Sequence, residues 1–200
     1  MKRLHRSDLF SWSEFNPRLN IDFNSFVWTR PQGNVVVDPL PLSAHDAEHL
    51  RSLGGVAWVV LTNSFHLRAT AELVKTFSAQ VAAPRAESAA FALPVARWLR
   101  DGEWVVPGLE VVELAGSKTP GELALILEKD TLICGDLVRS HRADTLMILK
   151  PEQGLPDPQA AAAAVKRLAG RGPFRSVLVG DGFCAFRDGQ ALLDTLCATL

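Results

Sequence analysis

The sequence has few cysteines, no excess of charge of either sign and no long apolar run. Three cysteines among 200 residues, without a CxxC pair, exclude a disulfide scaffold and favour a reducing compartment, so we expect a cytoplasmic protein. The 21 basic and 22 acidic side chains give a formal charge of −1, which argues against nucleic acid or an anionic membrane as a partner. The longest apolar runs, Val56–Leu61 and Ala160–Val165, are far shorter than a membrane span.

The length and the apolar content are those of a globular chain. Hydrophobic residues make up 48% of the sequence and charged residues 22%. A chain of this size buries about two thirds of its unfolded surface, so it needs no cross-links for stability. We therefore expect one domain over residues 1–200.

The apolar pattern predicts short strands in hairpin-like groups, with single helices between the groups. Strands are expected over residues 9–15, 21–29, 34–38, 56–61, 80–83, 104–106, 109–114, 122–128, 131–134 and 176–180. Helices are expected over residues 44–53, 67–77, 158–169 and 188–198, and in a segment that ends near Leu99. This order does not fit a doubly wound sheet. It favours an α+β fold in which two sheets pack face to face with helices outside.

Four predicted loops at strand ends are unusually rich in polar residues, and loops at strand ends are where binding and catalytic sites are commonly built. They are Leu61–Arg68 (LTNSFHLR), Gly116–Gly121 (GSKTPG), Cys134–Asp136 (CGD) and Val179–Gly182 (VGDG).

In this order and spacing, the four loops resemble the motifs of the metallo-β-lactamase superfamily. The family motifs are Thr-His-x-His-x-Asp-His, Gly-His-Thr-Pro-Gly, Gly-Asp after a strand, and Gly-His-Gly. The resemblance extends from about Asn24 to Asp194, and its most specific part is the Lys118–Glu122 loop followed by Gly135-Asp136. It implies a four-layered αββα sandwich, a two-metal hydrolytic site at one edge of the sheets, and a hydrolase of esters, thioesters or lactones. It also implies that the hairpin Phe26–Asp38 ends in an aspartate that supports the site.

The metal ligands of the family do not carry over to this sequence. The family's seven ligand positions fall on Asn63, Phe65, Leu67, Arg68, Lys118, Asp136 and Asp181. Only Asp136 keeps the family's own side chain, and only Asp181 among the rest can bind a metal. Arg68 and Lys118 are cations that repel a metal ion. We therefore expect no metal at the usual binuclear site.

Unpaired carboxylates in a site without cations would cost several kcal/mol. We therefore expect Arg68 and Lys118 to pair with Asp136 and Asp181. Such a protein would be a metal-free pseudoenzyme, and Asn63, Arg68, Lys118 and Asp181 would bind a small anionic ligand such as a carboxylate or phosphate. The alternatives are that these residues are solvated loop charges, or that the site is vestigial in a structural partner protein.

A rearranged metal site is the competing interpretation. His66 lies one position from the second histidine of the family motif, and a small change of register would turn it inward. His66, Asp136 and Asp181 would then hold one zinc, iron or manganese ion with open positions for water, and His141 would be a fourth ligand. In that enzyme Asp136 would be the catalytic base, with His66 as a second catalytic residue. The sequence leaves both interpretations open.

The remaining histidines and cysteines carry weaker signals. His45 and His49 are four residues apart, but the predicted helix is short, so we expect them at its surface. Cys134 is expected to be a small buried hydrophobe. Cys184 lies close to the last polar loop, and a catalytic role would require His66 beside it.

Overall fold

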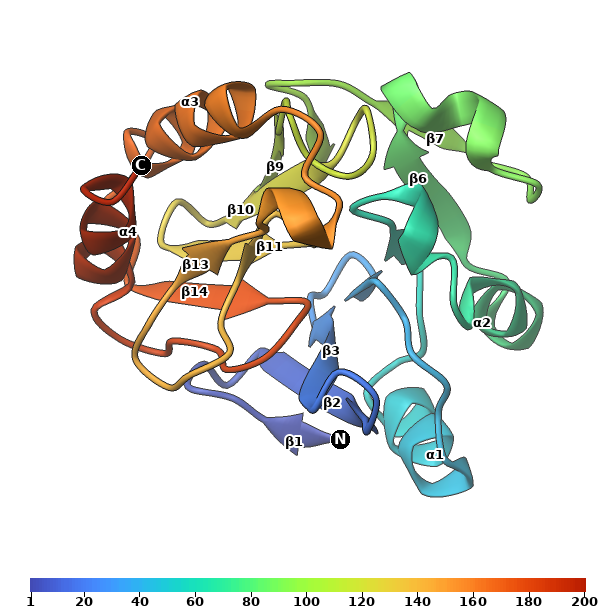
Figure 1. Ribbon diagram of the computed structural model, residues 1–200. Coiled ribbons are helices and arrows are strands. Elements are labelled where there is room, and N and C mark those ends of the chain that lie inside the picture. Colours follow the sequence, from blue (N-terminus) through green and yellow to red (C-terminus); the bar gives the residue numbers. More distant parts are fainter.

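A computed structural model describes residues 1–200 (Figure 1). Two β-sheets face each other in the middle of the molecule, and helices cover the outer face of each sheet (Figure 1). Helices α1 (Ala44–Ser52) and α2 (Thr70–Phe77) lie on one side, and α3 (Pro158–Ala169) and α4 (Gly189–Cys197) lie on the other. The predicted α+β fold, a four-layered αββα sandwich, is confirmed.

The first sheet contains seven strands in chain order. They are β1 (Lys2–Arg3), β2 (Leu9–Asn16), β3 (Ile21–Trp28), β4 (Val35–Val37), β5 (Trp58–Val60), β6 (Gln80–Pro84) and β7 (Arg97–Leu99). Strands β1 to β4 form antiparallel pairs, whereas β4 to β7 pair in parallel. The carboxyl ends of β4, β5 and β6 therefore lie at one edge of the sheet, and the loops that follow them leave from that edge.

The second sheet contains five strands in the order β14-β11-β10-β9-β8. They are β8 (Trp104–Val106), β9 (Leu109–Glu113), β10 (Leu123–Leu127), β11 (Thr131–Cys134) and β14 (Ser176–Val179). Strands β11 and β14 are parallel, so the loops after them also leave from one edge. A separate ribbon pairs β12 (Val138–Arg139) with β13 (Met147–Ile148).

Three apolar clusters hold the layers together. One cluster of 17 buried residues lies between the sheets, and clusters of 14 and 21 lie between each sheet and its helices. Every residue of β10 is buried, and its side chains alternate between the inter-sheet cluster and the cluster under α3 and α4. This is the burial expected of a strand with both faces covered. None of the helices has the length and apolar character that a membrane span requires.

The predicted helix ending near Leu99 is wrong. A 3₁₀ helix covers Arg85–Ala90, and Arg97–Leu99 forms β7, the edge strand of the first sheet. Pro94 prevents a continuous helix through this segment because it lacks an N–H donor. As part of β7, Leu99 is fully buried in the inter-sheet cluster.

Candidate functional site

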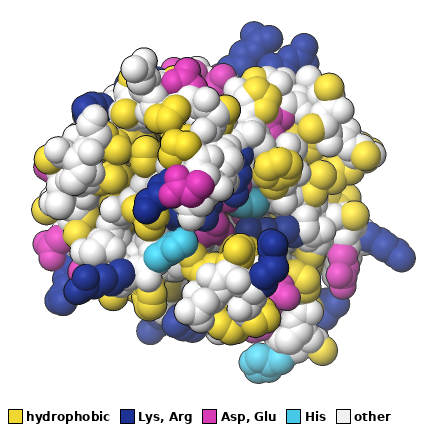
Figure 2. Space-filling model, viewed as in Figure 1, with side chains coloured by type: hydrophobic (Ala, Val, Ile, Leu, Met, Phe, Trp, Pro, Cys, Tyr) yellow, Lys and Arg dark blue, Asp and Glu magenta, His cyan; other side chains and the backbone are white.

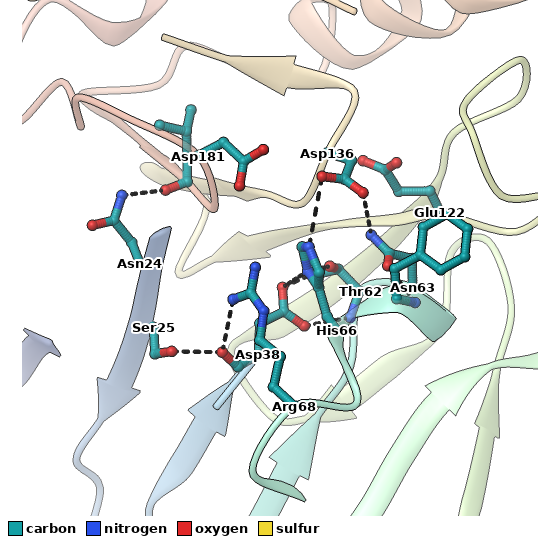
Figure 3. Close-up of polar contacts among 12 residues, drawn as sticks. Asn24, Ser25, Asp38, Thr62, Asn63, His66, Arg68, Glu122, Asp136 and Asp181 are labelled. Atoms are coloured by element: carbon teal, nitrogen blue, oxygen red, sulfur yellow. Dashed lines mark hydrogen bonds and ion pairs between the residues drawn. The ribbon is translucent and has the colours of Figure 1, made fainter. Parts of the chain in front are cut away.

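The polar loops meet at the edge where the two sheets open towards each other. Asp38 follows β4, His66 lies in the loop after β5, Asp136 follows β11, and Asp181 follows β14 (Figure 3). Basic, acidic and histidine side chains gather in a hollow near the centre of this face (Figure 2). Parallel strand order in both sheets thus brings four separate polar segments to one place.

A short 3₁₀ helix, Ser64–His66, turns His66 into the site. Asn63 caps this turn, since its Oδ1 accepts a hydrogen bond from the Phe65 N–H at 2.9 Å. The turn leaves His66 buried and sends Phe65 outward, where 64% of that residue is exposed. His66 is therefore inside the site although the family's ligand positions on either side of it, a histidine and an aspartate in the family motif, hold Phe65 and Leu67.

Asp38 orients His66 from the first sheet. Its Oδ2 lies 2.9 Å from His66 Nδ1 and accepts a hydrogen bond from Thr62 Oγ1 at 2.6 Å. Its Oδ1 accepts from the Thr62 N–H at 2.8 Å. Asp38 has a φ of +49°, a strained conformation for a residue other than glycine. The hydrogen bonds hold this strained residue in place, and they fix the plane of the imidazole ring.

The other ring nitrogen, His66 Nε2, lies 3.6 Å from Asp136 Oδ1. Burial disfavours a charge on the imidazole, but the Asp38 and Asp136 carboxylates outweigh it and raise the pKa of His66 to about 10. His66 is consequently an imidazolium at neutral pH, with both ring nitrogens protonated.

Arg139 joins the two carboxylates that the sequence places in the site. Its guanidinium lies 3.2 Å from Asp136 Oδ1 and 2.9 Å from Asp181 Oδ2, and all three side chains are buried. Nε and a terminal nitrogen also donate to the backbone carbonyl of Asp136, each at 3.0 Å. Sequence reasoning missed this residue. Its position three residues after Asp136 was the only available signal.

Backbone pairing positions Arg139 beside Asp181. The N–H of Ser140 donates to the Asp181 carbonyl at 3.1 Å, and the N–H of Phe183 donates to the Ser140 carbonyl at 3.0 Å. Gly182 is required at this crossing because any Cβ there would collide with the Ser140 carbonyl. The guanidinium and the carboxylate are thus held on two segments that are directly bonded to each other.

The expectation that Arg68 and Lys118 pair with Asp136 and Asp181 is wrong. Arg68 lies with its guanidinium 5.2 Å from the centre of the Phe23 ring, and its NH1 donates to the Asp38 carbonyl at 3.4 Å. Lys118 is half-buried and makes no ion pair within 4.0 Å. Because Arg139 already occupies the position between the carboxylates, both cations remain at the rim of the site without a carboxylate partner.

Asp136 and Asp181 have opposite pKa shifts. Burial opposes the charge on Asp136, but the hydrogen bond and charge of His66, together with Lys118 and Arg139, hold its pKa well below its usual range. Burial raises the pKa of Asp181, and the nearby charge of Asp136 raises it further, although Arg139 acts against both. Oδ1 of Asp181 is buried and has no hydrogen-bond partner. Asn63 contacts Asp136 weakly, with its Nδ2 3.5 Å from Oδ2.

Two buried glutamates that sequence reasoning missed hold the loops together. Glu122 accepts hydrogen bonds from the Leu137 N–H at 2.7 Å and from the Ser117 hydroxyl. Burial and the charge of Asp136 raise the pKa of Glu122 to about 7. Glu87 accepts from the N–H groups of Ser64 at 2.7 Å and Gly121 at 3.2 Å. The loops after β5, β9 and β11 are therefore linked through carboxylates.

The other candidate residues lie outside this network. His141 is exposed and lines a separate cavity of about 330 Å³ with Asp22 and Phe183. His45 and His49 lie on α1 at the surface. Cys184 makes long contacts, 3.8 Å to the Val179 carbonyl and 3.9 Å to Asn24, and burial raises its pKa to about 11. Cys184 makes no contact with His66 that would activate the thiol.

The residues present do not fit a divalent metal ion. Ligand atoms of His66, Asp136 and Asp181 lie within 4.8 Å of one another, a spacing that suits one ion. However, the guanidinium of Arg139 pairs with both carboxylates, and the ring nitrogens of His66 already face the carboxylates of Asp38 and Asp136. As arranged, His66, Asp136 and Asp181 are held in ion pairs with Asp38 and Arg139, and only Oδ1 of Asp181 is left without a partner.

Two facing sheets with polar loops at their common edge define the αββα class of metallo-β-lactamase-like proteins. A family model of the metallo-β-lactamase superfamily matches residues 1–200, and the chain belongs to this superfamily. No curated protein sequence matches the chain.

Solved structures share the fold at low sequence identity. A metallo-β-lactamase from Pontibacter korlensis is 16% identical with a TM-score of 0.76, over 99% of this chain and 98% of that one. TTHA1623 in a di-iron-bound form is 21% identical with a TM-score of 0.73, over 94% and 100%. The mono-zinc form of FIM-1 from Pseudomonas aeruginosa is 15% identical with a TM-score of 0.71, over 96% and 90%.

Proposed function

We propose that this chain is a metal-free member of the superfamily that binds a small anionic molecule through Arg68 and Lys118. One observation carries the proposal: the buried guanidinium of Arg139 lies within 3.2 Å of both candidate metal-binding carboxylates. The Arg139 guanidinium, which is part of the chain, takes the place of an exchangeable metal ion. The three free cysteines are consistent with action in the reducing cytoplasm.

The ion pairs at the centre of the site support the loss of metal. Asp38, Asp136 and Asp181 bring three carboxylates to the centre, and His66 and Arg139 bring two cations that contact all three. A divalent ion would have to displace Arg139 and remove a proton from His66, and each step leaves a buried charge without its partner. Both costs oppose binding of zinc, iron or manganese.

The rim cations support the binding of an anion. Arg68 and Lys118 lie beside the network, they are partly exposed, and neither pairs with a carboxylate of the chain. A carboxylate or phosphate would gain charge-assisted hydrogen bonds from them. The Nδ2 donor of Asn63 would offer a further contact at the same site, whereas Oδ1 of Asp181 could contact such an anion only by donating a hydrogen bond as a carboxylic acid.

Metal analysis tests the first half of the proposal. Protein purified without chelator should contain far less than one equivalent of zinc, iron or manganese by mass spectrometry. Titration with zinc should show no tight binding, and the Arg139→Met variant should bind zinc more tightly than the wild type. One equivalent of metal in the wild-type protein would overturn the proposal.

Thermal shift tests the second half. Phosphate and short carboxylates should raise the Tm of the wild type and leave the Arg68→Gln/Lys118→Gln variant unaffected. The matched control is Lys75→Gln/Arg85→Gln, which removes two exposed cations elsewhere in the fold. Anion binding is ruled out if the wild type and the rim variant respond alike.

A mononuclear hydrolase is the second candidate. The orphaned Oδ1 of Asp181 and the 4.8 Å spacing of the His66, Asp136 and Asp181 ligand atoms favour it. In that case His66 and the two aspartates would hold one ion, which would activate water for ester, thioester or lactone hydrolysis, and Asp136 would help to take up the proton. One tightly bound metal per chain would support this candidate over the metal-free one.

A further inference from the structure

A cavity of about 550 Å³ opens between the β2–β3 hairpin and the start of α2, beside the charge network. Arg68 connects the two, since its guanidinium lines the cavity while its NH1 donates to the Asp38 carbonyl. This volume lies within the range of small-molecule sites. A ligand of the rim cations that also fills this cavity would be held by more than its anionic group.

Three charged side chains line this cavity without a partner of opposite charge. They are Arg68 from the loop before α2, Glu14 from β2 and Glu72 from the first turn of α2. No ion pair or side-chain hydrogen bond joins Arg68 to either glutamate, although Glu72 is only one helical turn away. Unlike Arg139, which satisfies its carboxylates within the chain, this group presents one cation and two anions to solvent.

The rest of the lining is mainly apolar. Phe15, Phe23, Leu40 and the prolines Pro17 and Pro41 form most of it, and Phe15 is 56% exposed. The guanidinium of Arg68 lies 5.2 Å from the centre of the Phe23 ring, and this cation–π contact holds it beside the apolar lining.

The backbone conformation supports a binding role for Arg68. Arg68 has a φ of +33°, which is strained for an arginine, and strain of this kind concentrates where side chains must be aimed. The first turn of α2, directly after it, has no side-chain cap. The partial positive charge of that helix end adds to the guanidinium in attracting a carboxylate.

The geometry points to a zwitterionic ligand of the amino-acid class in this cavity, with an apolar side chain. Its carboxylate binds Arg68, its ammonium group is attracted to Glu14 and Glu72, and its side chain packs on Phe15, Phe23 and Leu40. This inference rests on the Arg68 part of the proposed anion site, since Lys118 does not line the cavity, and it specifies the ligand that binds there. The two glutamates would repel a ligand with only an anionic group, whereas a zwitterion also brings a cation that they attract.

Three probes with the same apolar side chain separate the contributions of the ammonium group and of the carboxylate to the affinity. Leucine carries both charges, 4-methylpentanoate lacks the ammonium group, and 3-methylbutylamine lacks the carboxylate. Calorimetry on the full chain should give leucine an affinity at least about tenfold higher than either analogue, a difference of about 1.4 kcal/mol. In Glu14→Gln/Glu72→Gln, leucine and 4-methylpentanoate should bind equally. The matched control Glu152→Gln/Asp144→Asn should behave as the wild type.

The outcomes distinguish this inference from the function on which it rests. If 4-methylpentanoate binds through Arg68 as tightly as leucine does, the zwitterion is wrong and the anion site stands. If phosphate, 4-methylpentanoate and leucine all fail to bind, both are wrong. The inference would also be overturned if 3-methylbutylamine bound as tightly as leucine and if Arg68→Gln left the affinity for 3-methylbutylamine unchanged.

Discussion

A guanidinium nitrogen of Arg139 lies 2.9 Å from Oδ2 of Asp181, and both side chains are almost completely buried. In a sandwich of this family the same edge normally receives metal ions, which neutralise the acidic side chains there. Here the chain supplies the neutralising charge itself. In the function we propose, the stability of the site therefore depends on covalently attached partners.

The first prediction concerns the loss of Arg139. Arg139→Met should lower the free energy of unfolding by about 3–5 kcal/mol, because Asp136 and Asp181 remain buried without their cation. Urea unfolding measures this. The control, Arg167→Met, removes an exposed pair with Asp101 and should cost no more than about 1 kcal/mol. Equal losses in the two variants would show that the buried network is not coupled to stability.

The second prediction concerns pH. The pKa of His66 is raised from 6.5 to about 10, so its charged form stabilises the folded state. Below pH 6.5 both states are protonated and the contribution is fully present. As the pH rises towards 10, the unfolded state releases this proton first and the contribution is lost. The stability difference between wild type and His66→Gln should shrink from pH 6 to pH 10, and a constant difference would contradict the assignment.

The third prediction concerns Thr62, which donates to Asp38 through both its N–H and its hydroxyl. Thr62→Val keeps the shape and the N–H but removes the hydroxyl donor, so Asp38 Oδ2 loses one hydrogen bond in a buried position. We expect a loss of about 1–3 kcal/mol in urea unfolding. Thr145→Val, at an exposed hydroxyl that bonds only to the Arg142 carbonyl, should cost much less. If Thr62→Val leaves the free energy of unfolding unchanged, the contact with His66 alone is enough to satisfy Oδ2 of Asp38.

The fourth prediction concerns Gly135, which precedes Asp136. A Cβ at this position would lie 2.5 Å from Thr62 Oγ1 and 3.2 Å from Glu122 Oε1, so Gly135→Ala would push on both sides of the network. The expected cost is about 1–3 kcal/mol, seen as a lower Tm. Gly170→Ala meets only ordinary contacts at 3.5 Å and serves as the control. A Tm for Gly135→Ala equal to that of the control would show that the loops can separate.

Most of the fold could be predicted from the sequence because burial produces a clear pattern. Strands such as Leu123–Leu127 are apolar throughout, and the polar loops follow the strands whose ends meet in space. The segment before Leu99 was misread as helical because its alanines favour a helix, whereas Pro94 and pairing with β6 decide its structure.

Side-chain direction within the site was the harder part. The Asn63-capped 3₁₀ turn decides that His66 points inward, and the positive φ of Arg68 sends its side chain to Phe23 instead of Asp136. The spacing of residues along the sequence predicts neither of these side-chain directions. Arg139 reaches Asp181 only because Ser140 pairs with the backbone at Gly182, a long-range contact that no short motif reveals.

The backbone crossing of Ser140 with Asp181 and Phe183 separates the residues that hold the charges from a loop that can vary in length. Because Ser140 is bonded through its backbone to Asp181 and Phe183, and Arg139 pairs with Met147 of β13, the exposed loop between β12 and β13 can change length without moving the arginine. The exposed residues His141–Thr145 of this loop are the natural place for insertions that reshape the entrance of the site. The charges at its centre are insulated from such changes.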